Sequence, residues 1–116
     1  RTAAMVRGGL EVPATRIQQS LSSMAELRGR LAGLMDEHGL NAMAAPAARG
    51  EAPEGIGSTG SPVMNMPWTH AGMPVISIPM GNGPAGLPLG LQLAGRPGRD
   101  EQLTAVARVL YSLISS

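Results

Sequence analysis

The 116 residues have room for one domain, and a content of 43% apolar and 15% charged residues is typical of a globular chain rather than a disordered one. The formal net charge is only +1, so no basic field for nucleic acid exists and we expect no nucleic-acid partner. The chain has no cysteine and its nine cationic residues are all arginine, which excludes thiol nucleophiles, thiolate metal sites and lysine bases.

The N-terminal part of the sequence predicts one long helix. Residues 2 to 6 resemble the end of an earlier element, and because the chain starts at Arg1 rather than methionine we expect a fragment. From Pro13 to His38, apolar residues recur at steps of three and four, which predicts an amphipathic helix. Gly39 suits the C-terminal cap of this helix.

A short strand, a long loop and a closing helix are predicted from the remaining non-hairpin segments. Asn41 to Ala45 is a run of small residues, which predicts a buried strand that ends before Pro46. Residues 46 to 62 are rich in Ala, Gly, Pro and Ser without periodicity and predict a loop. Near the C-terminus, Asp100 is predicted to cap a helix whose apolar residues from Leu103 to Ile114 share one face.

Gly81 to Gly86 match the pattern G-x-G-x-x-G, and they lie between two predicted strands, Val75 to Met80 and Leu87 to Ala94. A dinucleotide-binding loop needs a helix after its glycines, because the pyrophosphate binds the free N–H groups of the helix N-terminus. Here Pro88 and Gly90 oppose a helix. The glycine stretch is therefore predicted to be a hairpin connection without a bound cofactor.

Several polar and aromatic residues could suggest a site but have simpler interpretations. Asp36, Glu37 and His38 are consecutive on a helix and point about 100° apart, so they cannot share a metal ion, and we expect no metal site. His70 has no second histidine at ligand spacing and is predicted to form a hydrogen bond within a loop. Trp68, the only tryptophan, is either a local packing anchor or part of a pocket wall.

A series of short motifs occupies the second half of the chain. They are A-P at Ala45-Pro46 and Ala52-Pro53, T-G at Thr59-Gly60, N-M-P-W-T-H-A-G-M-P at 65–74, V-I-S-I-P-M-G at 75–81, G-L-P-L-G-L-Q-L-A-G-R at 86–96, and D-E-Q-L at 100–103. In order and spacing they resemble the C-terminal region of the amidase-signature enzymes, the Ser-Ser-Lys amide hydrolases. The resemblance covers residues 41 to 114, and the segment from Pro13 to Leu40 fits the family's preceding helix.

The resemblance implies an α/β fold, namely the C-terminal part of an α/β/α amidase-signature fold with a long helix, a short strand, a β-hairpin and a closing helix. Residues 1–116 would be the C-terminal segment of an amidase domain. In the family, a lysine activates a serine through a second serine, and water hydrolyses the acyl-enzyme. This sequence has no lysine and no G-G-S-S-G-G-like stretch, so we expect no catalytic residue in it and no activity from it alone.

The implied function is hydrolysis of a small-molecule carboxamide to an acid and ammonia or an amine, without a cofactor. The candidate substrate contacts are Met64, Asn65, Trp68 and Thr69, since the loop before Gly72 approaches the acyl pocket in the family. Many members carry Asn where this chain has Thr69, which puts the usual role of that position in doubt. Amidotransferase A subunits that generate Gln-tRNA or Asn-tRNA usually carry an Asp close to the place of Pro62, so its absence favours a general amidase.

Two alternatives stay open at this point: part of an Asp/Glu-tRNA amidotransferase A subunit, and a non-catalytic interaction module of the same fold. The longest apolar runs are far shorter than the roughly 20 residues of a membrane helix. We therefore expect no membrane partner and a cytoplasmic location, and the sequence leaves a homo-oligomer open.

Overall fold

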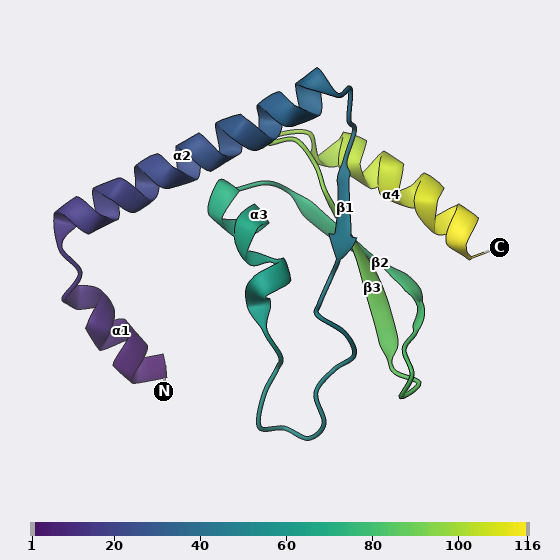
Figure 1. The fold of residues 1–116 in the computed structure, drawn as a ribbon, viewed down its shortest axis with the longest axis horizontal. Coiled ribbons are helices and arrows are strands. Elements are labelled where there is room, and N and C mark those ends of the chain that lie inside the picture. Colours follow the sequence, from purple (N-terminus) through teal and green to yellow (C-terminus); the bar gives the residue numbers. More distant parts are fainter. Residues whose placement is uncertain (1, 116) are drawn as a thin grey trace.

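The computed structural model describes residues 2–115, which form a small sheet with helices packed on both of its faces (Figure 1). In chain order the elements are α1 (Thr2–Leu10), α2 (Ala14–Glu37), β1 (Met43–Pro46), the 3-10 helix η1 (Pro62–Met64), α3 (Met66–Ala71), β2 (Val75–Asn82), β3 (Pro88–Ala94) and α4 (Asp100–Ile114). The long helix, short strand, hairpin and closing helix are confirmed in their predicted order, and the mixture of helices and strands confirms the α/β class.

The sheet has three strands in the order β1-β3-β2, and both pairs are antiparallel. Ala94 at the end of β3 pairs with Met43 on one side and with Val75 on the other. β2 is interrupted by a register shift between Pro79 and Gly81, where a proline without an N–H group cannot extend the ladder. β2 is an edge strand in which only Ile78 is buried.

The glycine stretch connects β2 to β3, as predicted. Gly83 N–H donates to Leu87 C=O at 2.9 Å, and Gly86 N–H donates to Gly83 C=O at 2.9 Å. Gly81 and Gly86 have φ angles of 115° and 82°, which other residues rarely adopt. The strand that follows Gly86 leaves no helix N-terminus at the position where a dinucleotide-binding loop would need one.

Each face of the sheet carries its own core. On one face, α4 packs against the hairpin through buried Ile78, Leu93, Leu103 and Ala107. On the other face, α2 and α3 enclose a second cluster, formed by buried Met35, Ala71 and Met73. Successive side chains of a strand point to opposite faces, so three short strands can support both clusters at once.

Arg96, just after β3, fastens the C-terminal end of α2 to the sheet. Its Nη2 donates to the carbonyl oxygens of Met35 and Leu40, at 3.1 and 3.2 Å, and its Nη1 forms an ion pair with Asp36. The carbonyl of Met35 also accepts from Leu40 N–H at 2.8 Å, so the guanidinium group adds a second donor there and supplies the donor for Leu40 just beyond the helix. His38 is the C-cap residue, and Gly39, with a φ angle of 61°, follows it and reverses the chain as a glycine after a helix commonly does.

Two local predictions are wrong. The segment around Trp68 and His70 was expected to be a loop, but it forms the six-residue helix α3, which has a proline in its first turn and ends at Gly72 with a left-handed φ of 63°. Such a helix is too short to show a periodic pattern. Asp100 was expected to be an N-cap, but Arg99 holds that position, and Asp100 lies in the first turn, where its charge favours the helix dipole.

The chain is spread out for its length. The radius of gyration is 17.1 Å, whereas a compact domain of this length has about 13 Å. The accessible surface is 8508 Å², whereas a compact monomer of this mass exposes about 6,000 Å². α1, which the sequence did not predict, has no buried residue and projects away from the sheet (Figure 1). The apolar stripe along α1 and the start of α2 is exposed; it contains Met5, Val6, Leu10, Ile17 and Leu21.

Among residues 2–115, no helix is both long enough and apolar enough to cross a bilayer.

Candidate functional site

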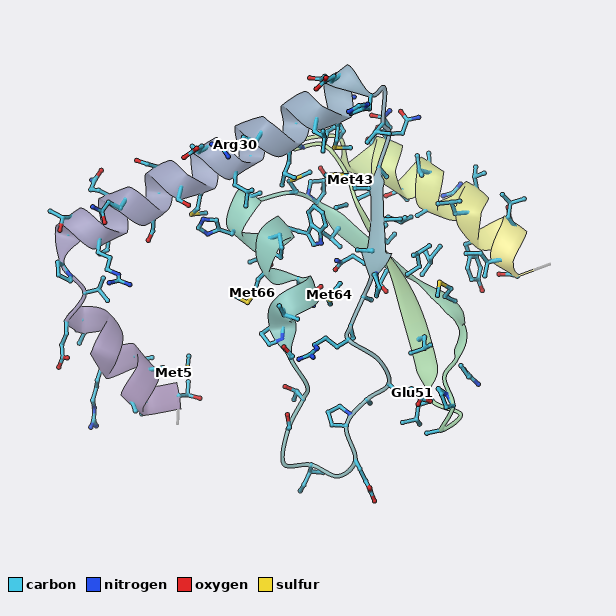
Figure 2. The ribbon with its side chains drawn as sticks, in the orientation of Figure 1. Met5, Arg30, Met43, Glu51, Met64 and Met66 are labelled. Carbon is cyan, nitrogen blue, oxygen red and sulfur yellow. The ribbon has the colours of Figure 1, made fainter. Side chains whose placement is uncertain are left out.

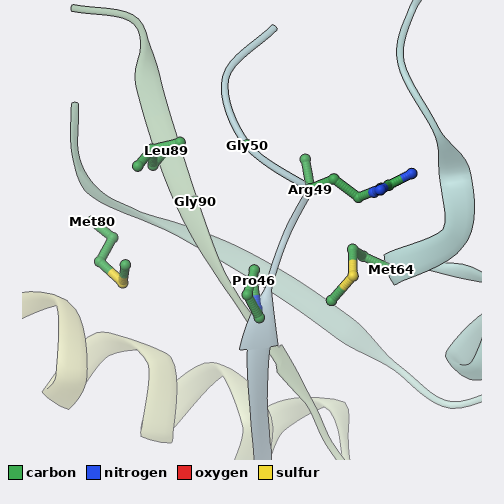
Figure 3. Close-up of a pocket in the computed structure, with 8 residues that line it drawn as sticks. Pro46, Arg49, Gly50, Met64, Met80, Leu89 and Gly90 are labelled. Atoms are coloured by element: carbon green, nitrogen blue, oxygen red, sulfur yellow. The ribbon is translucent and has the colours of Figure 1, made fainter. Parts of the chain in front are cut away.

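A hollow of about 430 Å³ opens beyond the end of β1, where β3 has no neighbouring strand on that side (Figure 3). The last contact between the two segments is the hydrogen bond from Ala47 N–H to Gly90 C=O, at 2.9 Å. Beyond it, the chain turns away into the loop 47–61. The residues that line the hollow are Pro46, Ala48, Arg49, Gly50, Met64, Met80, Leu89 and Gly90. All of them except Arg49 are uncharged, so the hollow is apolar with a single cationic group.

Gly90 forms part of the hollow because a side chain does not fit there. A Cβ atom on Gly90 would lie 2.7 Å from Ser77 Oγ and 3.0 Å from the Cβ of Ala47. The absence of a side chain lets the loop start close to β3, where a larger residue would push it outward.

Glu51 holds the loop 47–61 against the hairpin turn (Figure 2). Its carboxylate accepts from Leu87 N–H at 2.8 Å, and both of its oxygens lie 3.0 Å from the N–H of Ala85. A carboxylate bound to backbone N–H groups forms stronger hydrogen bonds than a neutral acceptor does. The turn amides that resembled a phosphate-binding loop thus bind an anion, which is supplied by the chain itself. This contact fixes the wall of the hollow that carries Arg49.

Replacing Gly83 by alanine is expected to release this contact, because a Cβ atom at residue 83 would lie 2.5 Å from Cδ of Glu51. Since the Glu51 side chain can rotate away, we expect a loss of about 1 kcal/mol rather than unfolding. Hydrogen exchange of the Ala85 and Leu87 amides should then become faster. The matched control is Gly57→Ala, since no atom lies within 4 Å of the added carbon at Gly57. Equal exchange rates in the two variants would contradict the clamp.

Arg49 lies two residues before Glu51, and in Figure 3 its side chain extends past Met64 on the side of the hollow away from Met80. Among residues 2–115, no hydrogen bond or ion pair engages its guanidinium group. Glu51, the nearest acidic residue in sequence, is occupied by the turn amides. Arg49 is therefore a cation at the edge of an apolar hollow with its bonding capacity unused. No sequence motif includes Arg49, although it is the only charged residue between His38 and Glu51.

Of the four candidate contact residues, Met64 lines the hollow. It ends η1, which Ser61 caps by accepting from Val63 N–H at 3.4 Å. The carbonyl of Met64 accepts from Nε2 of Gln92 at 3.0 Å, and Gln92 is the buried polar residue of β3. This bond ties η1 to the sheet and fixes the backbone position of Met64.

The other three candidates do not line this hollow. Asn65 is exposed between η1 and α3, and its side chain forms no capping hydrogen bond. Thr69 is exposed on α3. Trp68 packs against the cluster of Met35, Ala71 and Met73, which is the position expected of a packing anchor. Its Nε1 is buried and has no hydrogen-bond partner among the described residues.

His70 and Ser23 form a hydrogen bond of 3.1 Å between Nε2 and Oγ, which joins α3 to α2. A serine next to a histidine can form a nucleophile and base pair when a third group orients the imidazole. Among residues 2–115 no hydrogen bond orients the second ring nitrogen of His70, and neither residue lines the apolar hollow. Beside it, Arg28 Nε donates to Ala71 C=O at 2.7 Å. Both contacts dock one helix on the other.

Comparison with protein families matches residues 11–104 to the family described as Amidase. Among curated proteins, the A subunit of the glutamyl-tRNA(Gln) amidotransferase from Beijerinckia indica is 36% identical over 83 residues, which cover 64% of this chain and 17% of that protein. Its counterpart from Bartonella quintana is 39% identical over 54 residues, 47% of this chain and 11% of that protein. The counterpart from Mesorhizobium japonicum is 55% identical over 40 residues, 34% of this chain and 8% of that protein.

This chain therefore matches less than a fifth of the length of each of these relatives. The names of the relatives refer to tRNA(Gln), so the expectation that no nucleic acid is involved finds no support in them.

Proposed function

Because this chain belongs to the amidase family, we propose that it is the C-terminal segment of an enzyme that hydrolyses a carboxamide through a serine acyl-enzyme. The observation that carries the proposal is the family match over residues 11–104, which includes the long helix, the hairpin and the start of α4. The segment contributes the hairpin, two covering helices and the hollow beside Met64. The serine pair and the lysine belong to the part of the domain that precedes it.

The exposed surface of the chain supports its role as a segment of a larger domain. The chain exposes 8508 Å², about 2,500 Å² more than a compact monomer of its mass. An excess of this size equals the area that a large protein interface buries. Its apolar part includes the stripe on α1 and α2, with Leu10 85% exposed. The catalytic part of the domain would cover this surface.

The relatives favour a second, narrower candidate, the A subunit of a tRNA-dependent amidotransferase. In this case the released ammonia would be passed on to an aminoacyl-tRNA, and partner subunits and tRNA would be required. Pro62 favours the general amidase instead, because it stands close to the place where the A subunits usually carry an Asp. Both candidates hydrolyse an amide, but only the amidotransferase subunit would require partner subunits and tRNA to do so.

The proposal is tested by extending the chain upstream until it includes a glycine-flanked serine pair and a lysine, and by measuring ammonia release from simple carboxamides. We expect turnover from the extended chain and none from the 116 residues alone. Stimulation by partner subunits and charged tRNA would identify the tRNA-dependent amidotransferase, whereas full turnover without them would identify the general amidase. An extended, folded chain that releases no ammonia under either condition would refute the amide hydrolase.

A further inference from the structure

The hollow beside Met64 is shaped by the sheet on one side and by the start of the loop 47–61 on the other. β1 has only four residues, and the last bond beyond it joins Ala47 to Gly90, so β3 extends past this point toward Leu89 without a neighbouring strand on that side. Met64 borders the hollow and is tied to the sheet through Gln92. A volume of about 430 Å³ lies in the range of small-molecule sites, which runs from about 300 to 1,000 Å³.

The walls of the hollow suit an unbranched apolar chain. Met64, Met80 and Leu89 provide the larger side chains, and methionine adapts to ligands of different outline because it is unbranched and polarisable. No acidic residue lines the hollow, so nothing in its wall repels an anion or neutralises Arg49.

The loop that carries Arg49 is held against the hairpin turn, and Arg49 is the charged residue that lines the hollow. Glu51, two residues further on, is bound by the amides of Ala85 and Leu87, which restrains the loop that carries the arginine. The guanidinium group itself has no partner among residues 2–115. A guanidinium group binds a carboxylate with two parallel hydrogen bonds, and these charge-assisted bonds are stronger than hydrogen bonds to a neutral acceptor.

We propose that this hollow binds a small carboxylate-bearing molecule, with its apolar chain on Met64, Met80 and Leu89 and its carboxylate on Arg49. Arg49 is then a specificity-determining residue, and Glu51 is the residue that positions it. The assignment of this molecule as a substrate, an amide that also carries a carboxylate, rests on the proposed function. Binding itself does not, because every residue involved lies within this chain.

The test uses the 116-residue chain with isotope-labelled methionine methyl groups and two probes of nearly equal shape, hexanoate and hexanamide. We expect hexanoate to shift the methyl signals of Met64 and Met80 saturably, and hexanamide to bind roughly fivefold more weakly, the ratio that one exposed ion pair provides. Met5, on α1, is the internal control, since it should not respond. Equal affinity for both probes, or an equal response at Met5, would overturn the proposal.

Arg49→Gln is expected to remove the preference for hexanoate, whereas Arg7→Gln on exposed α1 makes the same change of charge and should preserve it. Glu51→Gln should weaken hexanoate binding while leaving Arg49 in the chain. The methyl signal of buried Met35 reports whether each variant keeps its core. A hexanoate affinity that is unchanged in Arg49→Gln would overturn the proposal.

In the extended chain, the corresponding measurement is inhibition of ammonia release from a neutral amide by hexanoate, which Arg49→Gln should relieve by a similar factor. If the extended chain hydrolyses the amide but hexanoate inhibits it equally with and without Arg49→Gln, the proposed function stands and the proposed carboxylate site is refuted. If the methyl shifts occur but the extended chain is inactive, the site stands and the hydrolase fails.

Discussion

Replacing Met35 by alanine is expected to lower the free energy of unfolding by about 2 to 5 kcal/mol, the cost of emptying a fully enclosed side-chain site. Met35 is the only buried residue of α2 and is 0% exposed. It packs with Ala71 and Met73, so its loss opens a cavity between two helices and the sheet. Because whole domains are stable by only about 5 to 15 kcal/mol, this single change would remove a large share of the free energy of unfolding.

The matched control is Leu34→Ala, which changes the neighbouring residue on the same helix. Leu34 is 43% exposed, so its truncation removes little buried area and should cost less than about 1 kcal/mol. Urea unfolding followed by the helical signal in circular dichroism measures both variants. Similar losses for the two would mean that the cluster around Met35 does not hold α2 to the sheet.

Replacing Arg96 by methionine is expected to lower the free energy of unfolding by about 1 to 3 kcal/mol, because it leaves the carbonyl of Leu40 without its donor and removes one of the two donors to the carbonyl of Met35. The methionine keeps much of the apolar stem but lacks the guanidinium group that bonds Met35 and Leu40 and pairs with Asp36. Arg96→Lys should recover only part of the loss, since one ammonium group cannot reproduce the planar fork.

The control for this change is Arg30→Met, which removes an ion pair with Glu26 on the surface of α2. The two side chains of that pair are 77% and 64% exposed, so we expect a change of no more than about 0.5 kcal/mol. Urea unfolding compares the three variants, and exchange of the amides in β1 localises the effect. If Arg96→Met were as stable as Arg30→Met, the attachment of α2 through Arg96 would be refuted.

The parts of the fold that the sequence predicts are those with long local patterns. α2 repeats its apolar spacing over 24 residues, and the hairpin combines alternating leucines with glycines that need positive φ. α3 has six residues between a proline and a glycine, so no period can be recognised in it. β1 was predicted within two residues of its observed start, although its pattern is half-buried rather than fully buried.

Long-range contacts set the limit for predicting the candidate site. Met64 was identified through the family's motifs. The roles of Arg49 and Glu51 instead depend on the hydrogen bonds of Glu51 with the amides of Ala85 and Leu87, which lie 34 and 36 positions further along the chain. No local pattern specifies which loop carboxylate reaches which turn. In the same way, the periodicity of α2 predicts an apolar face over its whole length, but whether Ile17 and Leu21 are covered depends on surfaces outside these residues.

Two aromatic residues allow the two sides of the sheet to be followed separately by spectroscopy. Trp68, the only tryptophan, lies with the cluster on the α2 side of the sheet, and Tyr111, the only tyrosine, lies on α4 at the other side. Tryptophan emission therefore follows the docking of α2 and α3, while tyrosine absorbance follows α4. β3 is the central strand between the two layers. Each signal gives a melting temperature for its own layer. The smaller the difference between these two temperatures, the more strongly β3 makes both layers melt as a single cooperative unit.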